Sequence, residues 1–395
     1  MPADTVAVVS TGLAPDTEYA LRVVAMNGFG RSTASDPAMA QTTTASMQFF
    51  AGMPSGNNGQ FTSIVVEPGG REHIAHYDVA NSNVLYTTRL FPTSYVTMTV
   101  DSGPTGVEDV GGDGTAIAVD PAGKVHIAAH DRTTDRPRYL TNATGPWTKA
   151  SLDSIPAGAQ PRMACHPSTG EVHLSYLDST DLGTPRVALL RYTRKLPGGT
   201  WRTPEGTTYD QTSVRHSLAL HGSGDPFQFS FDQRKDLRVY LGQGGSGSMT
   251  WSPYPAVPPP LSPPQIDDTA MAVDELGRIH VAFHEKSTGT LYAASYDSGW
   301  VLELVDQSEG VDLGSFCALA VQPSTQRLHL AYYDATRKDL RYARKDPGGP
   351  WVRRIIEAVG EVGSHASIAV DGTGKVYIAY RDETNRRLRV AVGTP

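Results

Sequence analysis

The chain has 395 residues, a formal net charge of −7 and only 19% charged residues, with 39 glycines and 28 prolines. This composition predicts many turns, and the lack of a long helical charge pattern favours an all-β fold. The acidic balance argues against a nucleic-acid or anionic-membrane partner, because both require a basic protein surface. No apolar run approaches the roughly 18 residues of a membrane-spanning helix.

The first 45 residues differ from the rest of the chain. Residues 1–4 are polar and lack the basic start and apolar stretch of a signal peptide, so we expect an intracellular protein or a targeting segment upstream. Residues 13–19, 21–27 and 30–32 resemble the second half of a fibronectin type III domain, with Tyr19 as its tyrosine corner and Asn27-Gly28 as a turn. The resemblance implies a partial β-sandwich over residues 1–45 and an extracellular, multidomain protein.

From residue 46 onward one pattern recurs in seven copies. Each copy has a short apolar strand, a turn with glycine, and a second strand that usually begins with histidine and ends in an acid. These acids follow one another at intervals of 47 to 54 residues: Asp78, Asp131, Asp178, Asp232, Glu285, Asp334 and Asp382. A period of about 40 to 50 residues is typical of a four-stranded propeller blade. We therefore predict a seven-bladed β-propeller over residues 46–395.

The remaining strands of each copy also repeat. Third strands follow the acids, and each fourth strand opens at an aromatic residue: Tyr95, Trp147, Trp201, Trp251, Trp300 and Trp351. The seventh copy stops after its third strand. We expect residues 46–50 to supply the missing fourth strand and so close the ring, because an unpaired edge would otherwise be exposed.

Residues that repeat in every copy are expected to be structural. The acids should accept backbone N–H bonds in the turns that follow them. The strand-initial histidines should bond a carbonyl or an acid of the adjacent blade. The tryptophans should wedge between blades, with sugar sites at blade junctions as the alternative. Cys165 and Cys317 lie in apolar strands of separate copies and are expected to be buried, unreactive thiols rather than a disulfide.

One turn motif resembles a known repeat class. Residues 346–351 (Asp-Pro-Gly-Gly-Pro-Trp) keep part of the S-x-D-x-G-x-T-W turn of the bacterial neuraminidase (BNR, or Asp-box) repeats, and residues 198–201 keep its end. The resemblance implies a sialidase-like propeller in which these turns are structural and lie on the face away from the pocket. It implies little about activity, because function belongs to the site and not to the fold.

Functional residues should break the repeat, since a binding or catalytic site needs distinct groups in distinct roles. Charged residues stand at the start of some first strands and just before some of the acids, and we predict that they converge on the axial mouth of the ring. The candidates at the first strands are Asp113, Arg162, Arg215, His216, Asp267, Asp268 and His365. The candidates before the acids are His130, His284, Tyr333 and Arg381.

These candidates leave three functional hypotheses open, one of which is a glycan-degrading enzyme of either the sialidase or the polysaccharide-lyase kind. A sialidase would use Arg162, Arg215 and Arg381 as a carboxylate-binding triad, but the arginine-bearing first-strand motif of that family is absent. A polysaccharide lyase would pair His130 or His284 with Tyr333 as acid and base. We favour a non-enzymatic extracellular module that binds carbohydrate or another protein, and the third possibility is a scaffold without a small ligand. No metal and no cofactor is expected.

Overall fold

The computed structural model describes residues 18–21, 26–27, 30–31, 38–41, 47–50, 56–90, 94–103, 109–152, 158–178, 189–206, 213–232, 236–244, 248–261 and 264–394. Within these ranges every element is a β-strand. No helix in this part of the chain is long and apolar enough to cross a membrane. The expectation of an all-β fold is confirmed.

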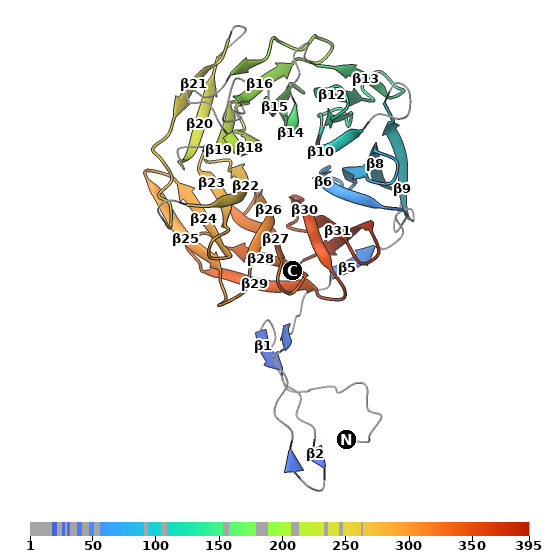
Figure 1. The fold of residues 1–395 in the computed structure, drawn as a ribbon. Coiled ribbons are helices and arrows are strands. Elements are labelled where there is room, and N and C mark those ends of the chain that lie inside the picture. The colour runs from blue at the N-terminus through green and yellow to red at the C-terminus, as the bar shows by residue number, and fades with distance from the viewer. Residues whose placement is uncertain are drawn as a thin grey trace.

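Seven antiparallel four-stranded sheets surround a central axis, which confirms the predicted seven-bladed β-propeller (Figure 1). The innermost strands of blades 1 to 7 are β6 (Asn58–Val66), β10 (Val110–Val119), β14 (Ala159–Cys165), β18 (Ser213–Leu220), β22 (Ile266–Val273), β26 (Leu313–Gln322) and β30 (Val362–Val370). The second strands are β7 (Glu72–Asp78), β11 (Val125–Asp131), β15 (Val172–Asp178), β19 (Pro226–Asp232), β23 (Ile279–Glu285), β27 (Arg327–Asp334) and β31 (Val376–Asp382).

The outer half of each blade has a third and a fourth strand. The third strands are β8 (Asn83–Leu90), β12 (Arg136–Thr141), β16 (Leu189–Lys195), β20 (Leu237–Gln243), β24 (Thr290–Tyr296), β28 (Asp339–Lys345) and β32 (Arg387–Gly393). The fourth strands are β9 (Ser94–Asp101), β13 (Thr148–Ser151), β17 (Glu205–Gly206), β21 (Thr250–Pro253), β25 (Trp300–Asp306), β29 (Trp351–Glu357) and β5 (Met47–Phe50).

The second strands are the most buried part of each blade. Every residue of β7, β11, β15, β23 and β31 is buried, because these strands lie between the sheets of two neighbouring blades. The first strands are less buried and mix buried with half-buried residues, as in β6. Two of the half-buried residues of β6, Phe61 and Ser63, line a cavity on the axis.

The two ends of the propeller share blade 7, as predicted. Strand β5 pairs with β32, with Gln48 opposite Val392 and Phe50 opposite Val390. The Phe50 ring also lies 5.6 Å from the ring of Tyr95 in blade 1. Residues 47–50 therefore complete the last blade and contact the first one.

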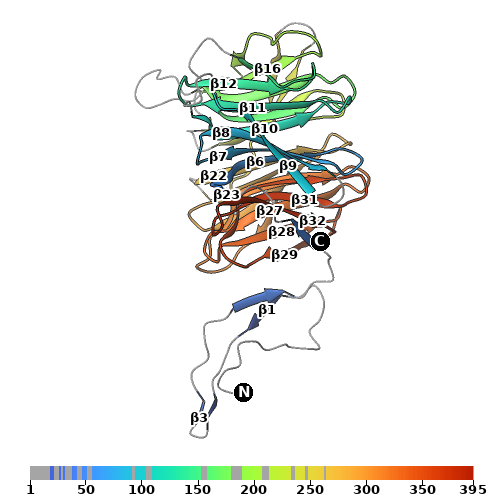
Figure 2. The same cartoon turned by 90° about the vertical axis from the view of Figure 1, so that its right-hand side faces the viewer.

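The N-terminal strands lie outside the ring (Figures 1 and 2). Strand β1 (Glu18–Leu21) pairs with β4 (Ala38–Gln41), and β2 (Met26–Asn27) pairs with β3 (Gly30–Arg31). Residues 1–17, the Tyr19 side chain and Gly28 lie outside the described residues. The fibronectin type III resemblance and the division of the chain at residues 45 and 46 therefore stay predictions.

The repeated histidines bond within their own blade, so the expectation of a partner in the adjacent blade is wrong. His73 Nδ1 lies 2.6 Å from the Tyr86 hydroxyl of the third strand, and the pairs His126–Tyr139 and His329–Tyr342 repeat this geometry at 2.6 and 2.7 Å. The histidine begins the second strand, and its nearest hydroxyl is on the strand that pairs with it. Each pair ties the second strand to the third.

The tryptophans pack between blades, as predicted. The Trp147 ring of blade 2 lies 5.2 Å from Tyr86 of blade 1, and the Trp201 ring of blade 3 lies 5.0 Å from Tyr139 of blade 2. Tilted and edge-on contacts of this kind add to the hydrophobic burial of the rings. The hydroxyl partners of the histidines thus also form the surface on which the next blade packs.

The acids that end the second strands bond the turns that follow them, which confirms the predicted structural role where the turn is described. Asp131 Oδ1 accepts N–H bonds from Thr133 and Thr134 at 3.0 and 3.2 Å. Turns of the same kind follow the second strands β7, β27 and β31. There the carboxylates of Asp78, Asp334 and Asp382 accept hydrogen bonds from the backbone N–H groups of Ala80, Arg337 and Asn385.

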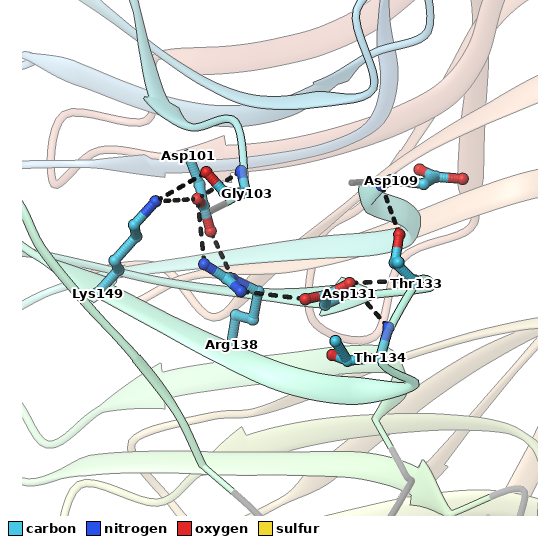
Figure 3. A network of polar contacts seen from close by, with 8 residues as sticks. All are labelled: Asp101, Gly103, Asp109, Asp131, Thr133, Thr134, Arg138 and Lys149. Atoms are coloured by element: carbon cyan, nitrogen blue, oxygen red, sulfur yellow. Dashed lines mark hydrogen bonds and ion pairs between the residues drawn. The ribbon is translucent and has the colours of Figure 1, made fainter. Parts of the chain in front are cut away.

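These acids also take part in ion pairs between blades (Figure 3). Arg138 of blade 2 bonds Asp131 of its own blade at 3.0 Å and Asp101, at the end of blade 1, at 2.6 Å. Both carboxylates are completely buried. Arg341 makes the corresponding pairs with Asp306 and Asp334 between blades 5 and 6. An arginine therefore links neighbouring blades at equivalent places in the ring.

Candidate functional site

A cavity of about 860 Å³ lies on the axis of the ring and is lined by the first strands of all seven blades. This volume is within the range of roughly 300–1,000 Å³ found for small-ligand sites. The central position of β6, β10, β22 and β30 is visible in Figure 1. The side chains that line the cavity therefore come from one equivalent stretch of each blade, and differences among blades decide what the cavity can bind.

The first strands differ in whether they carry an extra, bulged residue. In β6, Gln60 lies opposite Tyr77 and Ser63 opposite Ala75, so three steps along the first strand match two along the second. Strands β14, β26 and β30 show the same shift, whereas β22 continues from Asp268 in regular register. An extra residue of this kind bends the strand and re-aims a side chain.

The bulged residues of blades 6, 7 and 1 are all aromatic: Phe316, His365 and Phe61. Each has a positive φ, between 51° and 53°. This left-handed conformation is unfavourable for bulky residues and is concentrated at functional sites. All three side chains line the cavity. Blade 3 has Gln160 with φ 53° at the same place, and blade 2 has a glycine, Gly114, there.

Phe61, His365 and Phe316 form a continuous aromatic surface, called here the aromatic trio. The His365 ring lies 4.8 Å from the Phe61 ring and 4.5 Å from the Phe316 ring. Neighbouring blades hold two of these backbones in place. The Thr62 hydroxyl donates to the His365 carbonyl, and the Thr115 hydroxyl donates to the Phe61 carbonyl at 2.6 Å.

Burial makes the aromatic trio a neutral surface. It lowers the pKa of His365 to about 4, and the nearby charge of Glu383 only partly opposes this effect. The His365 ring is therefore uncharged at neutral pH and resembles the two phenylalanines in its contacts.

Polar groups line the remaining arc of the cavity. Arg162 and Gln160 come from β14 of blade 3, and Asp267 and Asp268 come from β22 of blade 5. The cavity thus has an aromatic side, built by blades 6, 7 and 1, and a polar side. Such a combination can bind a ligand that has both an apolar face and hydrogen-bonding groups.

His284 lies directly behind Asp267 and is completely buried. Its Nδ1 is 2.5 Å from Asp267 Oδ1, and its Nε2 is 2.7 Å from Asp312 Oδ1. Burial alone would lower the pKa of His284, but the hydrogen bond to Asp267 and the charges of Asp267, Asp312 and Asp268 outweigh it and raise this pKa. The two carboxylates of adjacent blades therefore favour the charged form of His284.

The structure brings some of the predicted site residues together at the cavity and not others. Arg162, Asp267, Asp268 and His365 line it. His216 is fully buried in β18 and is not among the lining residues. The side chains of Asp113 and Arg215 lie outside the described residues. A ligand-binding role stays a prediction for all of these residues.

The four residues before the acids occupy junctions rather than the cavity wall. Tyr333 donates to Glu361 of blade 7 at 3.3 Å, and Arg381 donates to Asn57 of blade 1 at 2.7 Å. His284 reaches Asp312 of blade 6 in the same way. His130 lies 2.8 Å from Asp135 within its own blade. Tyr333, Arg381 and His284 thus join a second strand to the next blade, and His130 joins its strand to Asp135 of the same blade.

Neither catalytic set considered from the sequence is brought together in the cavity by the described side chains. Of the arginines proposed for a sialidase, Arg162 lines the cavity, while Arg381 is buried between blades 7 and 1 and also pairs with Glu383 at 2.7 Å. His130 and Tyr333 bond Asp135 and Glu361, which do not line the cavity, and His284 lies behind Asp267 of the cavity wall without lining the cavity itself.

Sequence reasoning missed Phe61 and Phe316, because it searched for charged exceptions. A signal was present: three of the four strands that carry the bulge have an aromatic residue two places after a glycine, in Gly59-Gln-Phe61, Gly314-Ser-Phe316 and Gly363-Ser-His365. These glycines also have positive φ, from 88° to 123°.

Cys317 also lines the cavity, next to Phe316. Both cysteines are free, so the alternative of a disulfide is excluded. Burial raises the pKa of Cys317 well above its usual value, and that of Cys165 to about 12. Neither thiol is readily ionised, which agrees with the prediction of unreactive thiols, although Cys165 is only half-buried.

No family model matches the sequence, and no curated protein matches it. The BNR resemblance therefore stays a prediction. Solved structures similar to this chain include polysaccharide lyase Uly1, with 12% identity over 86% of this chain and 90% of that chain and a TM-score of 0.54.

Two further similar structures have other functions in their names. The Hadza microbial sialidase Hz136 has 11% identity over 81% of this chain and 73% of its own, with a TM-score of 0.52. A mutant of Aleuria aurantia lectin in complex with α-methyl-L-fucoside has 11% identity over 80% of this chain and 96% of its own, with a TM-score of 0.50. At these identities the likeness shows a shared propeller fold.

Proposed function

We propose that this protein is a non-enzymatic recognition module that binds carbohydrate in its axial cavity. The observation that carries the proposal is the insertion of one aromatic residue, in the left-handed conformation, into the first strand of three consecutive blades. The conformation costs about 1–2 kcal/mol at each non-glycine residue. Glycine would avoid this cost, so a function that needs the side chains accounts for their presence.

The chemistry of the cavity matches that of a sugar. A pyranose ring presents C–H groups on its faces and hydroxyl groups around its edge. The aromatic trio can pack against the C–H groups, and the carboxylates of Asp267 and Asp268 can accept hydrogen bonds from pairs of hydroxyls. Arg162 can donate to ring or hydroxyl oxygens. The similar structures named as a lectin, a sialidase and a polysaccharide lyase support carbohydrate over other ligands of this kind.

An extracellular location belongs to the same proposal. It follows from the fibronectin type III resemblance of residues 1–45 and from the glycan-directed names of the similar structures. A protein ligand is the alternative partner, and it would need a surface wider than the axial cavity.

A glycan array probed with the full chain, followed by calorimetric titration of the best ligand, tests the proposal. The variant Phe316→Gly removes one ring of the aromatic trio. The matched control is Leu276→Ala, because Leu276 is 71% exposed on the turn after β22 and does not line the cavity. We expect glycan binding that is lost in Phe316→Gly and retained in the control.

Two results would overturn the proposal. One is the absence of binding to any glycan, or binding that Phe316→Gly and Phe61→Gly leave unchanged. The other is cleavage of sialosides or anionic polysaccharides by the purified chain, which would establish an enzyme in place of a recognition module.

A further inference from the structure

The array Asp267–His284–Asp312 runs from the cavity wall, where Asp267 lies, to two residues that do not line the cavity. Asp267 belongs to β22 and has 28% of its side chain exposed, at the cavity. His284 belongs to β23 of the same blade and is fully buried. Asp312 precedes β26 of blade 6. Asp267 hydrogen-bonds to Nδ1, and the Asp312 carboxylate lies at ion-pair distance from Nε2, so a doubly protonated ring is favoured by both acids.

His284 also contacts the strand that presents Phe316. A Cβ atom added to Gly314 would lie 3.1 Å from His284 Cδ2, and Gly314 has a φ of 123°, which favours glycine. The ring therefore fills the space that this glycine leaves open. Gly314 is two residues before Phe316, so His284 connects Asp267, on the polar side of the cavity, with the bulge that builds its aromatic side.

Other charged groups face the array from each neighbouring element. Lys286, just after β23, lies 3.5 Å from Asp267 Oδ2. The charge of Asp268 in β22 helps to raise the pKa of His284. Burial and the charges of Asp268 and Asp267 raise the pKa of the buried Cys317 of β26, and the charge of Arg162 opposes this. Acidic groups outnumber basic ones immediately around His284, which favours its charged form.

We propose that His284 is a positioning residue of the axial site, whose charged ring fixes Asp267 at the cavity wall and couples it to the strand that carries Phe316. This inference rests on the proposed function, because it assigns Asp267 to the ligand. It assigns His284 no contact with the ligand. When His284 loses a proton, one N–H remains for two carboxylates and the ion pair is lost, so Asp267 is held less firmly.

The coupling makes ligand affinity dependent on pH. His284 is charged below its raised pKa, so affinity should be highest there and should fall as the pH rises through that pKa. We expect His284→Asn to weaken binding about tenfold or more in the acidic range, the loss associated with one buried charge-assisted hydrogen bond. The pH dependence should disappear in the same variant.

The experiment is a calorimetric titration of the best array ligand from pH 5.5 to 9 with the full chain. The variants are His284→Asn, Asp267→Asn and the control His221→Asn, since His221 lies on the turn between β18 and β19 and does not line the cavity. The control should reproduce the original profile. A His284→Asn variant with unchanged affinity and an unchanged profile would overturn the inference while leaving carbohydrate binding intact.

An NMR titration of the His284 ring without ligand provides an independent readout. We expect a midpoint above the ordinary value of 6.5 that falls in Asp267→Asn. A midpoint at or below 6.5 in the unaltered chain would overturn the inference even if no glycan binds. Failure of the proposed function, seen as no binding at any pH, is therefore distinguishable from failure of this inference.

Discussion

Replacing Phe316 by glycine should leave the propeller nearly as stable as before. Phe316 is half-buried, and its φ of 53° lies in the left-handed region. Glycine removes the strain of about 1–2 kcal/mol that this conformation imposes on a bulky residue. The lost packing of a half-buried phenylalanine costs about 1 kcal/mol. The greater freedom of glycine in the unfolded chain costs a further 0.5–1 kcal/mol, roughly.

These opposing contributions nearly cancel, so the free energy of unfolding should change by no more than about 1 kcal/mol. The comparison variant is Phe283→Ala. Phe283 is a completely buried residue of β23, packed against Tyr292 with ring centroids 5.9 Å apart. Its removal should cost about 3–5 kcal/mol, the range for aromatic residues in a packed core.

Urea unfolding followed by tryptophan fluorescence measures both variants, because tryptophans lie between blades and report on the opening of the ring. The predicted result is a midpoint close to the original for Phe316→Gly and a clearly lower one for Phe283→Ala. A loss of about 3 kcal/mol or more in Phe316→Gly would make Phe316 a core residue and would refute the reasoning that its strain serves a site.

Three further predictions concern the ring itself. Arg138→Met should cost about 3–5 kcal/mol in urea unfolding, because it leaves the buried Asp131 without its arginine and the buried Asp101 with Lys149 alone; the exposed pair of Arg132 with Asp109 is the control, and equal losses would contradict the account. Deletion of residues 47–50 should lower stability by about 2 kcal/mol or more, since blade 7 loses a strand and Phe50, and an unchanged melting temperature would argue against closure by β5. The unfolded chain protonates His365 near pH 6.5, whereas the folded chain does so only near pH 4. The melting temperature should therefore fall as the pH drops through this window. His365→Phe should lose less stability over the same window, and an identical profile would count against a buried, neutral His365.

The number of blades and their closure could be predicted because each copy repeats the same strands. The acids at intervals of 47 to 54 residues mark one blade each, and the missing fourth strand of the last copy has a counterpart at residues 47–50. Repetition also identified the acids of the turns and the tryptophans between blades. These features depend on local pairing and on one packing pattern used seven times.

The partners of the repeated histidines were assigned wrongly, although the sequence held a clue. His73 and Tyr86, His126 and Tyr139, and His329 and Tyr342 are each separated by 13 residues. That spacing places the two residues across a hairpin within one blade. The expectation of a partner in the next blade overlooked this local explanation.

The composition of the site was harder to predict, because it depends on register. A bulge at Phe61 or Phe316 can be recognised only when the first and second strands are aligned residue by residue. Contacts such as Tyr333 with Glu361 form between blades and leave no fixed spacing in the sequence. A search for charged exceptions therefore found part of the polar side of the cavity and missed two members of the aromatic trio.

Aromatic NMR signals recorded while the best glycan ligand is added test the central claim most directly. If the ligand enters the axial cavity, the ring signals of Phe61, His365 and Phe316 should shift together, with the same midpoint as the calorimetric titration. The signals of Trp147 and Trp201, which lie between blades, should stay in place. Shifts confined to those tryptophans, with the aromatic trio unchanged, would move the site to the blade junctions and contradict the account.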